Sequence, residues 1–164
     1  MSAGYTPPPY PYARLDEIIK IASGLDGGAV DLSIGTPCDS APPDVIAALA
    51  SDDAARGYPP SIGTAAFRSA AAGWIEHRLG ARVDPATEIA AVVGSKEFVA
   101  STPQYLKLRD RSRDTVLYPA ISYPTYAMGA TLAGCRSVPY RTLDEIDPAD
   151  AARALCVWVN SPGN

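Results

Sequence analysis

The feature that most constrains the fold is a regular alternation of short apolar runs and longer helical segments in the C-terminal half of the chain. Runs of strand length separated by helices of about a dozen residues predict a parallel sheet with helices packed on its faces. The final run, ALCVWVN, is almost entirely apolar, which predicts an interior strand. We therefore predict an α/β fold with strands at residues 88–94, 114–119, 135–140 and 154–160 and helices at residues 95–108, 122–134 and 148–154.

The N-terminal part of the chain has a different pattern, in which proline-rich stretches separate single helices. The first dozen residues are rich in proline and tyrosine, which predicts an extended arm rather than a core segment. Apolar residues at helical spacing predict a helix that ends at Gly24, and Thr64 is placed to cap a long helix through Leu79. Between these helices we predict a short strand over residues 30–34 and a short helix over residues 44–50.

Composition excludes several classes of function. The chain has 164 residues, a net charge of −4 and scattered basic residues, so it lacks the basic patch of a nucleic-acid-binding protein. The sequence shows neither a membrane-spanning apolar run nor a signal peptide, which predicts a cytoplasmic protein. The cysteines are odd in number and widely spaced, so we expect free thiols and no metal site. They are Cys38, Cys135 and Cys156.

Candidate binding residues lie at the turns that follow the strands, because ligands of such sheets gather outside the carboxyl ends of the strands. In VVGSKEF, Gly94 ends a strand and Ser95 opens a helix, so the first N–H groups of the helix are free to bind a phosphate. The spacing of a P-loop is absent. The alternative is that Ser95 only caps the helix and Lys96 is a solvated side chain.

Two further turns follow the next strands. In YPAISYPTY, Pro124 fixes Tyr123 at the start of a helix, where its ring could stack on a planar ligand bound at the first turn. The alternative is that Tyr123 packs only on its neighbours. In NSPGN, at residues 160–164, asparagine side chains could reach the same crevice, but asparagine beside proline and glycine is also ordinary turn chemistry.

Five segments, taken together and in order, resemble a known family. They are DLSIGTP, GYPPSIGTAAFRSAAAGWI, VVGSKEFVA, YPAISYPTYAMGATLAG and VNSPGN, and they extend over nearly the whole chain. These segments are similar to the N-terminal half of class I/II aminotransferases, which are fold type I enzymes that use pyridoxal 5'-phosphate (PLP). The resemblance implies an arm, helix and short strand over residues 1–35, which belong to the small domain and dimer contact. It also implies an incomplete PLP-binding large domain, with a mainly parallel sheet, over residues 36–164.

Within this family, the YPPSIGT loop, the GSKE turn and the YPxxSYPTYxxGAxLAG pattern are most similar to actinobacterial succinyldiaminopimelate aminotransferases. This similarity implies transfer of an amino group between N-succinyl-LL-2,6-diaminopimelate and 2-oxoglutarate in lysine biosynthesis, by a cytoplasmic homodimer. Other fold type I enzymes, such as aspartate aminotransferases and carbon–sulfur lyases, remain alternatives. A non-catalytic product that binds a partner subunit is a further alternative.

The resemblance also implies roles for individual residues. Ser95 and Lys96 match the phosphate-binding loop of the family, and Tyr123 matches the aromatic residue that stacks on the pyridine ring. Asn164 matches the asparagine that hydrogen-bonds the phenolic oxygen of PLP. Gly35 matches a backbone position beside the substrate carboxylate.

Tyr58 matches a tyrosine that reaches the phosphate of the partner subunit, which implies a homodimer, and the N-terminal arm resembles arms that dock on the second protomer. The family also needs a Schiff-base lysine, an aspartate facing the pyridine nitrogen and an arginine that binds the substrate carboxylate. In the family all three follow the position that corresponds to residue 164. We therefore expect a fragment with no catalytic residue and no activity of its own. The lysines that fail to match the Schiff-base position are Lys20, Lys96 and Lys107.

Overall fold

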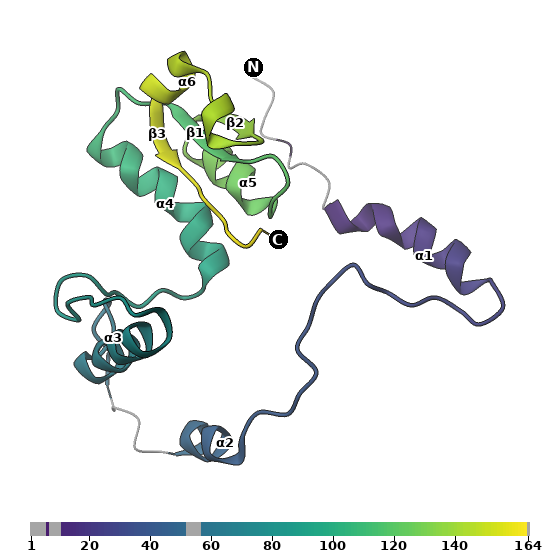
Figure 1. The fold of residues 1–164 in the computed structure, drawn as a ribbon, viewed down its shortest axis with the longest axis horizontal. Helices are drawn as coiled ribbons and strands as arrows, with labels where there is room; N and C mark the ends of the chain where they lie inside the picture. The colour runs from purple at the N-terminus through teal and green to yellow at the C-terminus, as the bar shows by residue number, and fades with distance from the viewer. Residues whose placement is uncertain (1–5, 7–10, 52–56, 164) are drawn as a thin grey trace. The chain divides into compact units, whose positions relative to one another are not determined.

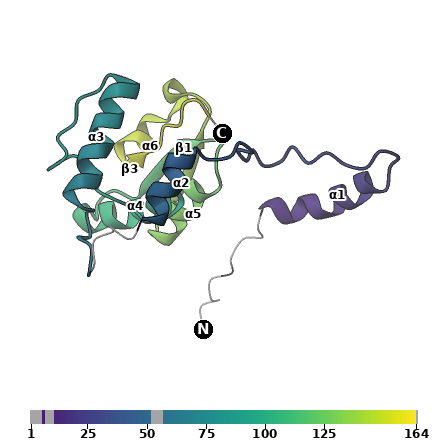
Figure 2. The same ribbon diagram turned by 90° about the horizontal axis from the view of Figure 1, so that it is seen from below.

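A computed structural model describes the chain as two units, residues 1–54 and 55–164, each with its own internal contacts. Figure 1 labels the helices and strands, and Figure 2 shows the same ribbon from below. Of the helices that the structure describes, none has the length and apolar character needed to cross a bilayer. The described residues are 6, 11–51 and 57–163.

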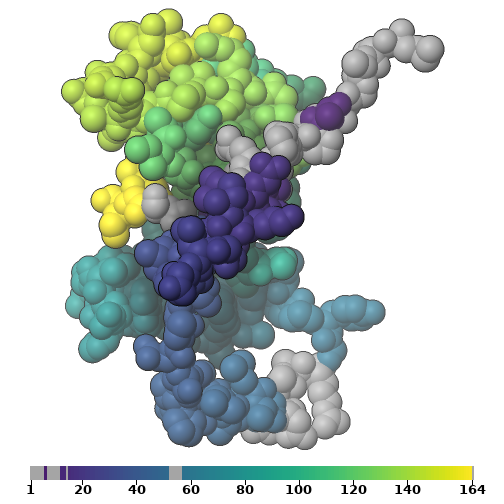
Figure 3. Space-filling model, turned by 90° about the vertical axis from the view of Figure 1, so that its right-hand side faces the viewer, coloured from purple at the N-terminus to yellow at the C-terminus, as the bar shows by residue number. Residues whose placement is uncertain are grey.

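The first unit contains a 3-10 helix, η1 (Pro11–Arg14), and two α-helices, α1 (Leu15–Ser23) and α2 (Pro43–Ala50). Both predicted α-helices are therefore confirmed. The apolar side of α1 lines a pocket with residues 29–33 of the same unit, and Figure 3 shows this helix in dark purple. The predicted extended arm lies almost wholly outside the described residues. The sequence predicts a domain boundary after residue 35, whereas the structure divides the chain into units after residue 54. The domain boundary of the complete fold stays a prediction.

The predicted strand over residues 30–34 is absent. These residues form no regular structure, and they pair with none of the strands that the structure describes. A strand needs a neighbour that satisfies its N–H and C=O groups, so an apolar run alone does not produce one. The prediction was wrong because sequence pattern reports apolar character and not the presence of a partner.

In the second unit, α3 (Ala65–Leu79) begins and ends at the predicted residues. The hydroxyl oxygen of Thr64 accepts a hydrogen bond from the backbone N–H of Phe67 at 3.1 Å, which satisfies a donor that the first turn leaves without a helical partner. Gly80 ends the helix in the left-handed conformation, with φ of 66°. The predicted cap and the predicted helix are confirmed.

The predicted strand over residues 88–94 is also absent. Its backbone makes one hydrogen bond to the loop before α3, from Ala91 N to Ile62 O at 3.0 Å. None of the described strands pairs with it, and the Val93 side chain is almost fully exposed. The physical reason is the same as for the first missing strand, because no neighbouring ladder satisfies these backbone groups.

The sheet has three parallel strands in the order β2-β1-β3. They are β1 (Thr115–Pro119), β2 (Arg136–Tyr140) and β3 (Ala154–Val157). The central strand forms the core of the sheet, because Val116 and Leu117 are 0% and 1% exposed. The three predicted strands that alternate with helices in this region are confirmed.

The apolar sequence predicts an interior position for β3, but in the described sheet β3 is an edge strand that pairs only with β1. Cys156 is half-buried, whereas Val157 is 43% exposed and Val159 beyond it is 64% exposed. Apolar composition reflects how far the two faces of a strand are covered. It does not determine which strands lie along its two edges, and this is why the prediction was wrong.

Two helices, α4 (Ser95–Arg109) and α5 (Thr125–Leu132), pack side by side against the sheet (Figures 1 and 2). Their contact is close at Gly129, where an added Cβ would lie 2.9 Å from the backbone oxygen of Val99. The chain runs from β1 to β2 and then back across β1 to β3, so right-handed crossovers place α6 (Pro148–Ala152) on the opposite face from α5. The predicted α/β fold with helices on both faces of a parallel sheet is confirmed.

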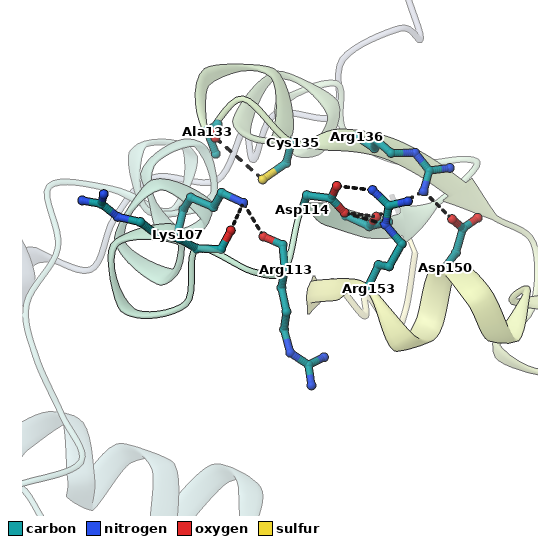
Figure 4. A network of polar contacts seen from close by, with 10 residues as sticks. Lys107, Arg113, Asp114, Ala133, Cys135, Arg136, Asp150 and Arg153 are labelled. Atoms are coloured by element: carbon teal, nitrogen blue, oxygen red, sulfur yellow. Dashed lines mark hydrogen bonds and ion pairs between the residues drawn. The ribbon is translucent and has the colours of Figure 1, made fainter.

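Ion pairs join the elements at the edge where the strands begin (Figure 4). Asp114, immediately before β1, accepts hydrogen bonds from the guanidinium of Arg153. Arg136 of β2 donates to Asp150 of α6 at 2.7 Å. A short 3-10 helix, η2 (Leu143–Glu145), leads from β2 toward α6. These contacts fix the end of the sheet that lies opposite the carboxyl ends of the strands.

Candidate functional site

Two of the predicted binding turns meet at the carboxyl end of the sheet. The strand β1 ends at Pro119, and the chain then turns through residues 120–124 into α5. The ammonium nitrogen of Lys96, in the first turn of α4, lies 5.9 Å from the centroid of the Tyr123 ring. This distance is within the range of a cation–π interaction. The structure therefore brings together two residues that the sequence predicts for one site.

The N-terminus of α4 offers free backbone donors. Gly94 is the N-cap residue, and it has no side chain with which to cap the helix. The first helical hydrogen bond runs from Phe98 N to Gly94 O at 3.0 Å, so the preceding N–H groups have no acceptor within the helix. Ser95 is the first residue of the helix and not its cap, so the reading of Ser95 as an N-cap alone was wrong. The free N–H groups belong to Ser95, Lys96 and Glu97.

Short-range hydrogen bonds hold Tyr123 at the start of α5. The Ser122 hydroxyl donates to Pro119 O at 2.6 Å, and Tyr126 N donates to Tyr123 O at 3.2 Å. The Tyr123 side chain is half-buried. An aromatic ring fixed in this way can stack on a planar ligand at little cost in conformational entropy.

The third predicted turn follows β3. Trp158 N donates to Leu117 O at 2.8 Å, and the Tyr140 hydroxyl donates to Trp158 O at 2.6 Å, so the backbone is held just before the turn. Asn160, at the start of the turn, is half-buried. Asn164, the predicted ligand of the phenolic oxygen, lies outside the described residues.

An aromatic cluster connects these turns, and it was not predicted from the sequence. The Trp158 ring lies edge-on to Phe98, with centroids 6.1 Å apart, and it lies 5.4 Å from the centroid of Tyr126. The local signal is that Phe98 follows Ser95 by three positions and Tyr126 follows Tyr123 by three positions. Residues at this spacing share one side of a helix.

Two further predicted site residues, Tyr58 and Gly35, are exposed. Tyr58 lies in the loop before α3, and its relative exposure of 105% means that no described residue covers it. Gly35 is an exposed residue of the first unit, whereas the three turns belong to the second. The roles of these residues toward a partner subunit and a substrate carboxylate stay predictions.

Cys135 and Cys156 of the second unit are poor nucleophiles. Burial raises the pKa of the Cys156 thiol to about 11, and it also raises the pKa of Cys135, so both thiols stay protonated at neutral pH. All three cysteines are free, as predicted. In the part of the chain that the structure describes, no group of three or more acidic, histidine or cysteine side chains could hold a metal ion.

The lysines of the second unit have different surroundings. Lys107 Nζ donates to Arg113 O at 2.5 Å and to Arg111 O at 3.0 Å, so it holds the loop after α4 (Figure 4). Lys96 lies at the turns, where its exposed side chain reaches over the Tyr123 ring. No sequence pattern predicted this approach of Lys96 to the Tyr123 ring.

The site therefore has the chemistry for a particular class of ligand. The N–H groups of α4 and the Ser95 hydroxyl suit a phosphate, whose charge the helix dipole stabilises. The Tyr123 ring suits a planar group attached to that phosphate. These features suit a phosphorylated planar cofactor at the carboxyl ends of the strands of an α/β fold, and the residues present fit PLP. The chain belongs to the aminotransferase class I and II family, whose sequence profile matches residues 28–164. That family is PLP-dependent.

The chain is also similar to individual aminotransferases. The 4-dedimethylamino-4-oxo-anhydrotetracycline transaminase OxyQ of Streptomyces rimosus is 39% identical over 96% of this chain and 42% of its own. The LL-diaminopimelate aminotransferase of Desulforudis audaxviator is 34% identical over 96% of this chain and 42% of its own. The solved structure of a probable N-succinyldiaminopimelate aminotransferase from Thermus thermophilus matches with a TM-score of 0.73 and 30% identity, over 93% of this chain and 44% of that one. The chain thus spans less than half the length of these relatives.

Proposed function

We propose that this chain supplies the phosphate-binding and ring-stacking part of a PLP site, in an aminotransferase that moves an amino group between an amino acid and a 2-oxo acid. The observation that carries the proposal is the 5.9 Å approach of Lys96 to the Tyr123 ring, because it puts a helix N-terminus beside an aromatic side chain. The helix N-terminus binds a phosphate and the ring stacks on a planar group. PLP combines these two features.

Each predicted site residue has a role in this proposal. The Ser95 hydroxyl and the N–H groups of Ser95 and Lys96 bind the phosphate, and Tyr123 covers one face of the pyridine ring. Asn164 hydrogen-bonds the phenolic oxygen, and the backbone of Gly35 lies beside the substrate carboxylate. When bound, PLP supplies the electron sink that stabilises negative charge at the substrate α-carbon. The residues of this chain orient the cofactor for that chemistry.

The proposed functional unit is a cytoplasmic homodimer. Tyr58 supports the dimer, because its fully exposed side chain is available to reach a phosphate bound in a partner subunit. Crosslinking at this position tests the dimer. We expect a photoreactive group at Tyr58 to join two chains, and PLP to protect against the reaction. Crosslinking within one chain alone would contradict the proposed dimer.

The proposed substrates are N-succinyl-LL-2,6-diaminopimelate and 2-oxoglutarate. The relative named LL-diaminopimelate aminotransferase and the Thermus thermophilus structure support this choice. The alternatives are another fold type I activity, such as aspartate transamination or carbon–sulfur lysis, and a tetracycline ketone of the kind named for OxyQ. Steady-state rates with each amino donor, amino acceptor and carbon–sulfur substrate, for an intact enzyme that contains this chain, distinguish them. A preference for aspartate or for the tetracycline ketone would refute the diaminopimelate assignment.

Binding of PLP to the purified chain tests the cofactor site directly. We expect inorganic phosphate to compete with PLP, and pyridoxal, which lacks the phosphate, to bind at least about tenfold more weakly, because hydrogen bonds to a charged group contribute about 1.5–3 kcal/mol. Ser95→Ala should weaken PLP binding by about tenfold for the same reason. Ser101→Ala is the matched control on the same helix, because the Ser101 hydroxyl donates to Glu97 O at 2.9 Å. Equal affinities for PLP and pyridoxal would contradict the proposal.

We expect the isolated chain not to catalyse transamination. Lys20, Lys96 and Lys107 do not match the Schiff-base position of the family, and Lys107 is also hydrogen-bonded to two backbone carbonyls. Borohydride reduction in the presence of PLP should therefore give no stoichiometric label on one lysine, and glutamate should not be turned over. One specific label together with turnover would refute this expectation.

A non-catalytic role through a partner subunit is the second candidate, and the exposure of Tyr58 is the observation that favours it. Co-expression with a full-length relative such as OxyQ distinguishes the two. Recovery of a stable mixed dimer, with the relative's activity changed, would favour a partner-binding role. A chain that never associates with the relative would remove that role.

A further inference from the structure

Trp158 contacts both of the helices that begin at the proposed site. Its ring lies 6.1 Å from Phe98 of α4 in an edge-on arrangement, with an interplanar angle of 82°. The ring also lies 5.4 Å from Tyr126 of α5, with an interplanar angle of 44°. Aromatic pairs at such separations attract each other, so the indole adds to the direct contact of α4 with α5 at Gly129 in holding the two helices together.

The spacing matters because both contacts are one helical turn from the proposed ligands. Phe98 is three residues after Ser95, and Tyr126 is three residues after Tyr123. Residues three apart lie on the same side of a helix, so a displacement of Phe98 or Tyr126 displaces the ligand beside it. The indole thus contacts each helix one turn after the residue that is proposed to bind the ligand.

The backbone of Trp158 is itself held by the sheet. Its N–H donates to Leu117 O at 2.8 Å in the central strand, and its carbonyl oxygen accepts from the Tyr140 hydroxyl at 2.6 Å. The side chain therefore projects from a fixed point. Trp158 therefore links the sheet, through its backbone, to both helices, through its ring.

Within the described part of the chain, the indole N–H group of Trp158 forms no hydrogen bond that would explain why a tryptophan occupies this position. The Nε1 atom is buried, and among the described residues it has no hydrogen-bond acceptor. A buried donor without a partner lowers stability. The favourable interactions of Trp158 are therefore those of its ring faces and edges, which phenylalanine can reproduce in part.

We propose that Trp158 is a positioning residue of the cofactor site, whose indole sets the distance between the phosphate-binding turn of α4 and the ring of Tyr123. The inference rests on the proposed function. A ligand that engages both turns at once depends on this distance, whereas a ligand that engages only the α4 turn does not. PLP is of the first kind and inorganic phosphate is of the second.

The test compares the affinities of the 164-residue chain for PLP, by titration calorimetry, and for inorganic phosphate, by phosphorus NMR. We expect Trp158→Ala to weaken PLP binding by about tenfold and to change phosphate binding by less than about twofold. Trp158→Phe is the matched control and should bind both ligands within about twofold of wild type, because it keeps an aromatic ring in contact with Phe98 and Tyr126. If circular dichroism shows that Trp158→Ala is unfolded, Phe98→Leu replaces it, because this variant keeps the indole and removes its aromatic contact with α4. Phe98→Leu should then weaken PLP binding by about tenfold and change phosphate binding by less than about twofold.

Each outcome has a separate meaning. Equal PLP affinity in wild type and Trp158→Ala overturns the inference and leaves the proposed function intact. An equal loss of PLP and phosphate binding also overturns it, because the indole then supports the α4 turn alone. A wild-type chain that binds phosphate but not PLP overturns the proposed function, and the inference with it.

Discussion

Tyr123 contributes the ring-stacking part of the proposed site, and the contributions of its ring and its hydroxyl can be separated. Tyr123→Phe keeps the ring, so its affinity for PLP should stay within about twofold of wild type. Tyr123→Ala removes the ring, so its affinity should fall by about tenfold or more, while the affinity for inorganic phosphate stays the same. Titration calorimetry measures both ligands. If Tyr123→Phe binds PLP as weakly as Tyr123→Ala, the hydroxyl and not the ring is responsible.

Asp114 gives the fold a defined dependence on acid. The hydrogen-bonded guanidinium of Arg153 lowers the pKa of the Asp114 carboxyl from its usual 3.8 to about 2. A lowered pKa means that the carboxylate stabilises the folded state above pH 3.8 and that this contribution is lost as the pH falls toward about 2. We expect Asp114→Asn to lower the urea midpoint at pH 7. The difference from wild type should shrink as the pH falls and should vanish below about pH 2.

Glu76→Gln is the matched control for this prediction. Glu76 pairs with Arg82 at 2.8 Å, but the side chains are 55% and 88% exposed, and an exposed ion pair contributes only about 0–1 kcal/mol. The control should therefore unfold close to wild type at both pH values. An Asp114→Asn variant that matches the control at pH 7 would show that the Arg153 contact does not stabilise the fold.

At the scale of residues, the sequence predicts site residues that stand beside a turn-forming glycine or proline. Ser95 and Tyr123 stand at turns that a neighbouring glycine or proline identifies, and the structure puts them where those turns meet. The sequence did not predict that Lys96 reaches the Tyr123 ring or that Trp158 joins two helices. Both contacts connect residues that are distant along the chain, and no local pattern encodes the distance between them.

At the scale of elements, the close contact of α4 with α5 depends on Gly129. A Cβ there would lie 2.9 Å and 3.1 Å from the backbone oxygens of Val99 and Ala100, which cannot move without shifting α4. We expect Gly129→Ala to lower the free energy of unfolding, measured in urea, by about 1–3 kcal/mol. It should also weaken PLP binding, because the same displacement changes the spacing of the two proposed ligands.

Gly73→Ala in α3 is the control for this substitution. An added Cβ at Gly73 meets nothing within 4 Å, so the variant should gain about 0.5–1 kcal/mol of stability from the higher helix propensity of alanine. The two glycines then change stability in opposite directions. A neutral Gly129→Ala variant would show that α4 and α5 are not closely packed in solution.

Helices could be predicted because their signals are local. Thr64 and Gly80 mark the two ends of α3 through contacts with residues of the same helix. Strands depend on a partner elsewhere in the chain, so apolar runs over residues 30–34 and 88–94 predicted strands that the described sheet does not contain. The position of β3 at an edge was missed for the same reason.

At the scale of the whole molecule, alternation of strands and helices was sufficient to predict the α/β class, because parallel strands require crossover helices. It could not predict how much apolar surface the described fold leaves uncovered. β3 pairs with β1 along one edge, and Val159 beyond it is 64% exposed. An exposed apolar edge strand is a site at which chains pair with one another.

We therefore expect the purified chain to self-associate as its concentration rises, and Val159→Lys to reduce that association, as measured by sedimentation velocity. Val159 lies two residues beyond the end of β3, and a lysine there opposes pairing along the strand edge because its charge would have to be desolvated. Ser69→Lys, on the exposed surface of α3, is the control because it makes the same change in charge. The chain has a net charge of −4, so an added positive charge by itself weakens repulsion between chains and favours association. A decrease in Val159→Lys but not in Ser69→Lys would locate the contact at the β3 edge, and equal behaviour of the two variants would exclude it.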